Sequence, residues 1–171
     1  MAQLADYFDY KNRLMKDLLT DSEIVHLIND SVPVEDGKSL AYTQVFPYEY
    51  VPDTTERGLT YICCDVDIYA AANKTFLTPV LYIWVFAHRS QMRLPEGGVR
   101  VDALCNKICE KINGSRFYGL GPLEIYGCKR FAPQTDHIGK MLIFHTSEVN
   151  KFRDPKRPIP TNRKESVYAD S

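Results

Sequence analysis

The segment VLYIWVFAH, residues 80–88, most constrains the fold, because as a strand it would be apolar on both faces. Side chains alternate between the two faces of a strand. One face would carry Val80, Tyr82, Trp84 and Phe86, and the other Leu81, Ile83 and Val85. A strand without a polar face is covered on both sides. In a chain of 171 residues its own helices can cover one face, which leaves the other for a partner chain.

The segment before it, YICCDVDIYA, residues 61–70, alternates instead. One face would carry Ile62, Cys64, Val66 and Ile68, and the other Tyr61, Cys63, Asp65, Asp67 and Tyr69. This pattern predicts a strand that is buried on one side and wet on the other.

The remaining periodic segments set the fold class. Apolar residues at three- and four-residue steps predict a helix over 4–19, where Lys11 interrupts the apolar stripe, and a helix over 101–113, which Gly114 closes as a left-handed cap. The capping-box spacing of Thr20 and Glu23 starts a short helix between them. Two further strands should form a hairpin around residues 132–139. We therefore predict an α+β fold, a mainly antiparallel sheet of about four strands with helices on one face, in one domain over residues 1–150.

Residues 31–58 have no period, and their three prolines exclude a regular helix. The segment is nevertheless too apolar for a solvated loop, since it contains Val45, Phe46, Tyr48, Tyr50 and Val51. It must pack on something, either its own sheet or a neighbouring chain.

The C-terminal extension, residues 151–171, is basic and poor in apolar residues. Its basic residues are Lys151, Arg153, Lys156, Arg157, Arg163 and Lys164, against the acids Asp154, Glu165 and Asp170. Such a segment cannot order alone. We expect an ordered extension that is held by docking on another chain.

Charge and cysteine content limit the kinds of partner and the cellular compartment that we expect. The formal net charge is −1, so no global field favours nucleic acid or membrane binding. The longest apolar run, Pro79 to Ala87, is too short to span a bilayer, and acids interrupt the position of a secretory core. With five cysteines, an odd number, we expect a soluble, reduced, intracellular protein that does not contact membrane.

Asp65 and Asp67 are the only feature that suggests an enzyme. Paired acids on one strand face can hold divalent metal ions for a nuclease. Two-metal sites need further carboxylates from other elements, and Glu124 and His88 have no recognisable spacing for that role. Alternation alone already explains both acids.

The spacing of the cysteines and histidines fits neither a zinc site nor a thiol enzyme. Cys63 and Cys64 are adjacent, so they point to opposite faces, and Cys105 belongs to an apolar helix stripe. None of the four histidines is placed beside a cysteine as a thiol enzyme requires. We expect no enzyme activity, no cofactor and no bound metal.

The layout resembles a known class of proteins. LLTDSEIVHLI leads through VFPYEYVPDT to YICCDVDIY, followed by VLYIWVFAHRSQMR and GGVRVDALCNKICEKINGSRFYGLGPLEI. Residues 10–150 are similar to small neck or tail-completion proteins of tailed bacteriophages, in particular the tail-terminator type. The resemblance implies a virion protein of α+β fold that forms a ring, often of six subunits, on the tail tube and joins it to the head connector. It transfers no functional residue.

The residues are compatible with a ring. Its subunits meet through two different surfaces, and we expect Phe46, Tyr48, Tyr50, Tyr82, Trp84 and Phe86 to supply them. Asp65 and Asp67 would then make the lumen acidic, so that passing double-stranded DNA slides instead of sticking. The basic extension would dock on a neck partner. Another neck component, either head-completion or adaptor protein, is the closest alternative, with assembly in the host cytoplasm in each case. A metal-dependent nuclease and a cellular binding domain are the alternatives from other classes.

Overall fold

The fold was determined as a computed structural model, which describes residues 4–53, 58–70, 75–116, 118 and 121–149. The helices are α1 (Leu4–Thr20), α2 (Ser22–Ile28) and α3 (Arg100–Ile112), with two 3₁₀ helices, η1 (Val34–Leu40) and η2 (Arg89–Gln91). The strands are β1 (Val45–Phe46), β2 (Thr60–Ala70), β3 (Phe76–His88), β4 (Glu124–Gln134), β5 (His137–His145) and β6 (Glu148–Val149).

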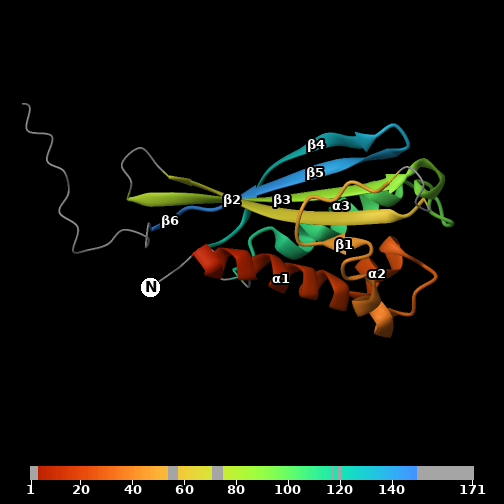
Figure 1. Ribbon diagram of the computed structural model, residues 1–171, viewed down its shortest axis with the longest axis horizontal. Coiled ribbons are helices and arrows are strands. Elements are labelled where there is room, and N and C mark those ends of the chain that lie inside the picture. Colours follow the sequence, from red (N-terminus) through yellow and green to blue (C-terminus); the bar gives the residue numbers. More distant parts are fainter. Residues whose placement is uncertain (1–3, 54–57, 71–74, 117, 119–120, 150–171) are drawn as a thin grey trace, which may run out of the picture.

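The strands form one sheet in the order β1-β2-β3-β5-β4, and β6 pairs with the start of β3 (Figure 1). The four long strands pair antiparallel, whereas β1 pairs parallel to β2. The predicted α+β class is therefore confirmed. The sheet is mixed, not mainly antiparallel as predicted, because two residues of the aperiodic segment add a parallel strand at one edge.

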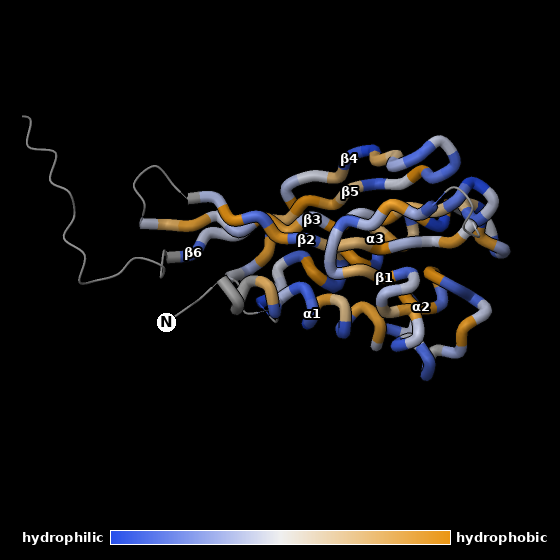
Figure 2. The backbone as a smooth tube through the Cα atoms, viewed as in Figure 1, coloured by the Kyte–Doolittle hydropathy of each residue, from blue (hydrophilic) through white to orange (hydrophobic). Residues whose placement is uncertain are grey.

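Helices cover one face of the sheet, which we call the inner face. Its side chains include Ile62, Leu81, Ile83, Val85 and Phe144, and all are buried in one cluster with residues of α1, α2 and α3. Hydrophobic residues alternate with hydrophilic ones along α1 and concentrate in the centre of the sheet (Figure 2). Each helix thus buries the stripe that its sequence predicts.

The helix ends follow local chemistry. The carboxylate of Asp21 accepts hydrogen bonds from the backbone amides of Glu23 (3.1 Å) and Ile24 (3.2 Å), which caps α2. The cap is one residue later than the predicted Thr20. Gly114 follows α3 with φ of +79°, the left-handed conformation predicted for it.

The aperiodic segment packs on its own sheet, which is one of the two alternatives predicted. After β1, residues 47–53 lie against the face opposite the helices, which we call the outer face. There Phe46, Tyr61, Cys63 and Phe86 form a second buried cluster, with Tyr50 and Phe131 against it. The Gln134 side chain donates a hydrogen bond to the Pro52 carbonyl and so ties this segment to the end of β4.

Gly139 makes the second cluster possible. It pairs with Phe86 across the sheet, and a Cβ at this position would overlap the Val85 carbonyl oxygen and lie 2.5 Å from the Phe86 Cβ. A residue without a side chain is needed for the strands to approach this closely.

The ends of β2 and β3 project past the start of α1, with β6 beside them (Figure 1). The expected C-terminal extension begins after β6 and lies outside the described residues. Among the described residues, none of the helices is both long and apolar enough to cross a membrane.

Candidate assembly surfaces

Part of the outer face is closed by the chain itself. The rings of Phe46 and Tyr50 stack with centroids 4.1 Å apart, and Tyr61 and Phe86 stack at 5.3 Å. Phe46 is 4% exposed and Phe86 is 0% exposed. These two predicted interface residues therefore contribute to the fold of the single subunit, since Tyr50 stacks on Phe46 and Phe86 lies in the same buried cluster.

The rest of the outer face is open. Tyr82 and Trp84 stack with centroids 5.8 Å apart and planes at 19°, and both side chains are half-buried. Their neighbours in register on β5 are Ile143 and Met141. The loop that covers Phe86 does not bury this pair, so the structure brings Tyr82 and Trp84 together as one apolar surface that a partner can contact.

Tyr48 is separated from that surface. Its ring lies 5.5 Å from Phe46, on the segment that follows β1, and its side chain is 45% exposed. The six predicted interface residues thus divide into three kinds: a closed cluster around Phe46, Tyr50 and Phe86, an open stack of Tyr82 and Trp84, and Tyr48 on an edge segment.

Asp65 forms an ion pair and is not a free carboxylate on the solvent-facing side of β2. Its carboxylate lies 2.8 Å from the ammonium group of Lys11 in α1 and also accepts a hydrogen bond from the Val66 amide at 2.8 Å. Lys11 is the residue that interrupts the apolar stripe of α1. Since β1 pairs with β2 only at Ile62 and Cys63, this contact lies on the edge of β2 that β1 leaves uncovered.

Asp67 belongs to a different group. It accepts a hydrogen bond from the Tyr69 hydroxyl at 3.1 Å. Hydrogen bonding to Tyr82, and then to Asp67, raises the pKa of Tyr69 to about 12. Asp65 and Asp67 therefore have separate protein partners, and only Asp67 keeps its charge unpaired by a cation among the described residues.

The arrangement of possible metal ligands is sparse. Within residues 4–53, 58–70, 75–116, 118 and 121–149, no group of three or more His, Cys, Asp or Glu side chains is placed to hold a metal ion. The structure does bring His88 and His137 together across β3 and β5, with ring centroids 5.3 Å apart. Their wide separation in sequence gave no sign of this pairing.

The cysteines are all free thiols. Burial raises the pKa of Cys63, Cys64 and Cys105 from an ordinary value near 9 to about 12 in each case. A thiol must lose its proton to attack an electrophile. These three side chains therefore act as small apolar residues, as predicted for Cys105, while Cys128 on β4 is exposed.

This difference predicts an order of reaction. At pH 8 a maleimide should modify Cys128 first, whereas Cys63, Cys64 and Cys105 should react only after unfolding. Burial raises the pKa of these three thiols in the folded protein above the ordinary value near 9, so the folded state favours the protonated thiol. The stability that this gives is complete below about pH 9 and is lost as the pH rises toward 12. Mass spectrometry of timed labelling checks the order, and fast labelling of Cys63 in the folded protein would contradict it.

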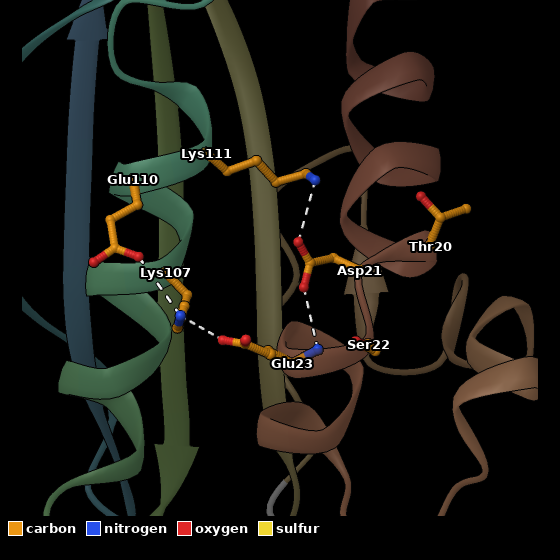
Figure 3. A pocket seen from close by; sticks show the side chains of 7 residues that line it. All are labelled: Thr20, Asp21, Ser22, Glu23, Lys107, Glu110 and Lys111. Atoms are coloured by element: carbon orange, nitrogen blue, oxygen red, sulfur yellow. Dashed lines mark hydrogen bonds and ion pairs between the residues drawn. The ribbon is translucent and has the colours of Figure 1, made fainter.

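A polar hollow of about 540 Å³ separates α2 from α3 (Figure 3). Lys107 forms ion pairs with Glu23 and with Glu110, and Lys111 lies 3.2 Å from the Asp21 carboxylate. Burial acts to raise the pKa of Asp21, but the Ile24 amide and Lys111 lower it overall. The charges lining this hollow are thus directed at one another, and they fasten the two helices instead of presenting free charge to a ligand.

A second hollow, of about 350 Å³, lies beneath β4, and we call it the β4 groove. Its floor is apolar, from Met92, Val101 and Ile138, and its rim carries Lys129, Arg130 and Lys140. Sequence analysis missed this groove. The consecutive cations at 129 and 130 were the available signal, but their position over α3 depends on how the hairpin closes.

Comparison with known proteins identifies a family. The model of the YomW family matches residues 12–146. The chain belongs to the YomW family. That name is phage-derived, of the Bacillus SPbeta type, so the YomW match indicates a phage protein. No curated protein matches the chain.

Proposed function

We propose that this YomW-family protein is a structural virion component that forms a homo-oligomeric ring at the phage neck. In this role it terminates the tail tube and joins it to the head connector, and DNA passes through its lumen. The open Tyr82–Trp84 stack carries the proposal, because the subunit buries the neighbouring Phe46 and Phe86 in its own cluster and leaves this pair only half-buried. The family match supports a phage setting.

The chemistry of the open face favours a protein partner over nucleic acid. Stacked aromatics bind single-stranded nucleic acid when basic residues accompany them. Here the position paired with Tyr82 on β2 is Asp65, which Lys11 neutralises, and Asp67, two residues further along β2, is the acid that would repel phosphate. Large aromatic side chains in an otherwise uncharged centre are typical of protein interfaces.

The acidic lumen takes a more specific form in this proposal. Lys11 neutralises Asp65, so Asp67 is the acid that would repel DNA phosphates. The basic residues of the extension, from Lys151 to Lys164, keep their proposed role of docking on a neck partner. Loss of residues 151–171 should weaken joining of head and tail without unfolding the subunit, as pull-down of purified neck partners would measure.

The ring itself is testable with purified protein. We expect light scattering after size exclusion to give a mass of several subunits, and negative-stain electron microscopy to show rings. Trp84→Ala should weaken assembly by about 10- to 100-fold in Kd, because buried tryptophans are frequent hot spots. Tyr42→Ala is the matched control, since Tyr42 is exposed but lies in the turn before β1.

The outcomes separate the alternatives. A monomer at all accessible concentrations would contradict the ring. Rings that bind the head connector but not the tail tube would favour a head-completion or adaptor protein, which shares the same assembly chemistry.

A further inference from the structure

The rim of the β4 groove carries more positive charge than the subunit neutralises. Arg130 and Lys140 are direct partners across β4 and β5. Like charges in directly opposite positions repel each other. The ammonium group of Lys140 lies 2.6 Å from the Asp102 carboxylate of α3, whereas Arg130 has no ion pair among the described residues. Asp102 therefore neutralises Lys140 and not Arg130, and a second carboxylate would complete the group.

The groove below them can hold an apolar side chain. Met92 and Ile138 are half-buried within its floor, and its volume of about 350 Å³ is enough for an aromatic ring with its flanking backbone. A ligand that fits both features presents an apolar side chain next to a carboxylate.

The segment after β1 has this combination. Tyr50 stacks on Phe46, while the residues on either side of it, Glu49 and Val51, are exposed. Tyr48 is 45% exposed and Val51 is 51% exposed, with the exposed carboxylate of Glu49 between them. Glu49 forms no ion pair among the described residues. Residues 48–51 thus present an exposed surface on which a carboxylate lies between two apolar side chains.

The two surfaces lie on opposite faces of the sheet. Residues 47–53 lie on the outer face and reach Gln134 at the end of β4, whereas the groove is lined by Val101 and Asp102 of α3 and lies on the inner face. A surface on one face that complements a surface on the other produces head-to-tail contacts, which close into a ring when the rotation allows it.

We propose that residues 48–51 of one copy dock in the β4 groove of the next copy, with the Glu49 carboxylate pairing with the Arg130 guanidinium. The inference rests on the proposed ring and names its contact. Tyr48 enters the apolar part of the groove, and Glu49 supplies the missing negative charge.

A charge-reversal experiment tests the contact between copies. Glu49→Lys places a cation against Arg130, and Arg130→Glu places an acid against Glu49, so each variant alone should assemble at least about tenfold more weakly than the wild-type chain. Mixed in equal amounts, the two variants should assemble again. When the two kinds of copy alternate, every contact between neighbours pairs one acidic side chain with one basic side chain. A chain that carries both substitutions should also recover, because its docking pair is reversed but still complementary. Size exclusion with light scattering measures all four samples.

The controls separate charge from folding. Glu96→Lys and Lys16→Glu change exposed charges elsewhere and should assemble like the wild-type chain. Thermal unfolding of each variant should stay close to wild type, because Glu49 and Arg130 are both exposed in the subunit.

Each outcome decides something different. A monomeric wild-type chain overturns the ring and the docking together. Wild-type assemblies with unaffected single variants overturn the docking and leave the ring. Single variants that fail and are not rescued by mixing also overturn the docking, because positions 49 and 130 would then act on assembly independently of each other.

Discussion

Phe86→Ala should lower the free energy of unfolding of the isolated subunit by about 3–5 kcal/mol, the usual cost of emptying a buried aromatic position. Phe86 is completely buried on the outer face and contacts the rings of Tyr61, Phe131 and His137, with centroids 5.3, 5.7 and 6.0 Å away. The segment after β1 closes over this site, so the surroundings are held from both sides and have little room to collapse into the cavity.

Urea unfolding followed by circular dichroism measures this loss, since the chain has one tryptophan and Trp84→Ala removes it. The experiment should be run at concentrations below assembly, because binding of other copies would add to apparent stability. Trp84→Ala is the matched comparison from the same strand face: it should lower subunit stability less and assembly more. If Phe86→Ala instead left the subunit stable but abolished assembly, Phe86 would belong to the subunit interface and the closed cluster would be misassigned.

Arg100→Met should destabilise the subunit by about 3 kcal/mol, since each carbonyl left buried without a donor costs about 1–3 kcal/mol. Arg100 is only 3% exposed. Its Nε donates to the Gln91 carbonyl at 2.8 Å and its Nη1 donates to the Leu27 carbonyl at 2.7 Å, while Asp30 lies 3.8 Å from Nη2. One side chain thereby joins the start of α3 to the end of α2 and to η2.

The shape of the guanidinium group provides the sharper test. Arg100→Lys keeps the charge but cannot reach two carbonyls in a fork, so its loss should fall between wild type and Arg100→Met. Arg93→Met, an exposed arginine in the same loop region, should change the unfolding free energy by less than about 0.5 kcal/mol. Chemical denaturation of the three variants decides the point, and an Arg100→Lys variant as stable as the wild type would show that the fork is not needed.

The elements that repeat a short pattern could be predicted from sequence. β3 is apolar at every position from Val80 to Ala87, and this pattern predicted helices on one face and a partner on the other. The helices do cover the inner face, whereas on the outer face the chain buries Phe86 and leaves Tyr82 and Trp84 half-buried. The three helices bury the stripes that their spacing predicts, and Gly114 ends α3 in the left-handed conformation. Each of these features depends on residues within a few positions along the chain, so a local sequence pattern is enough to predict it.

Contacts between distant segments could not be predicted in the same way. The pairing of β1 with β2 involves two residues and carries no periodic signal, so neither the parallel strand nor the cover over Phe86 could be anticipated. Lys11 was recognised as a break in a helix stripe, but its contact with Asp65 spans 54 positions. The burial of Arg100 likewise depends on two carbonyls from other segments.

The candidate surfaces show the same division. Alternation placed Tyr82 and Trp84 on one face, and the structure keeps them together there. Alternation also placed Phe86 on that face. Phe86 is buried there while Tyr82 and Trp84 are not, and this difference depends on how residues 47–53 fold over the sheet. The β4 groove depends on where a hairpin lies relative to α3, and no local pattern reports that position.

The Lys11–Asp65 contact has a consequence for copies crowded together during expression. An uncovered strand edge can template unlimited growth of stacked sheets, which ends in insoluble fibrils. Here the Val66 amide at that edge is already occupied by the Asp65 carboxylate, and a lysine stands in front of it. A second chain cannot add its backbone at this point without displacing both, so this edge resists the growth of stacked sheets.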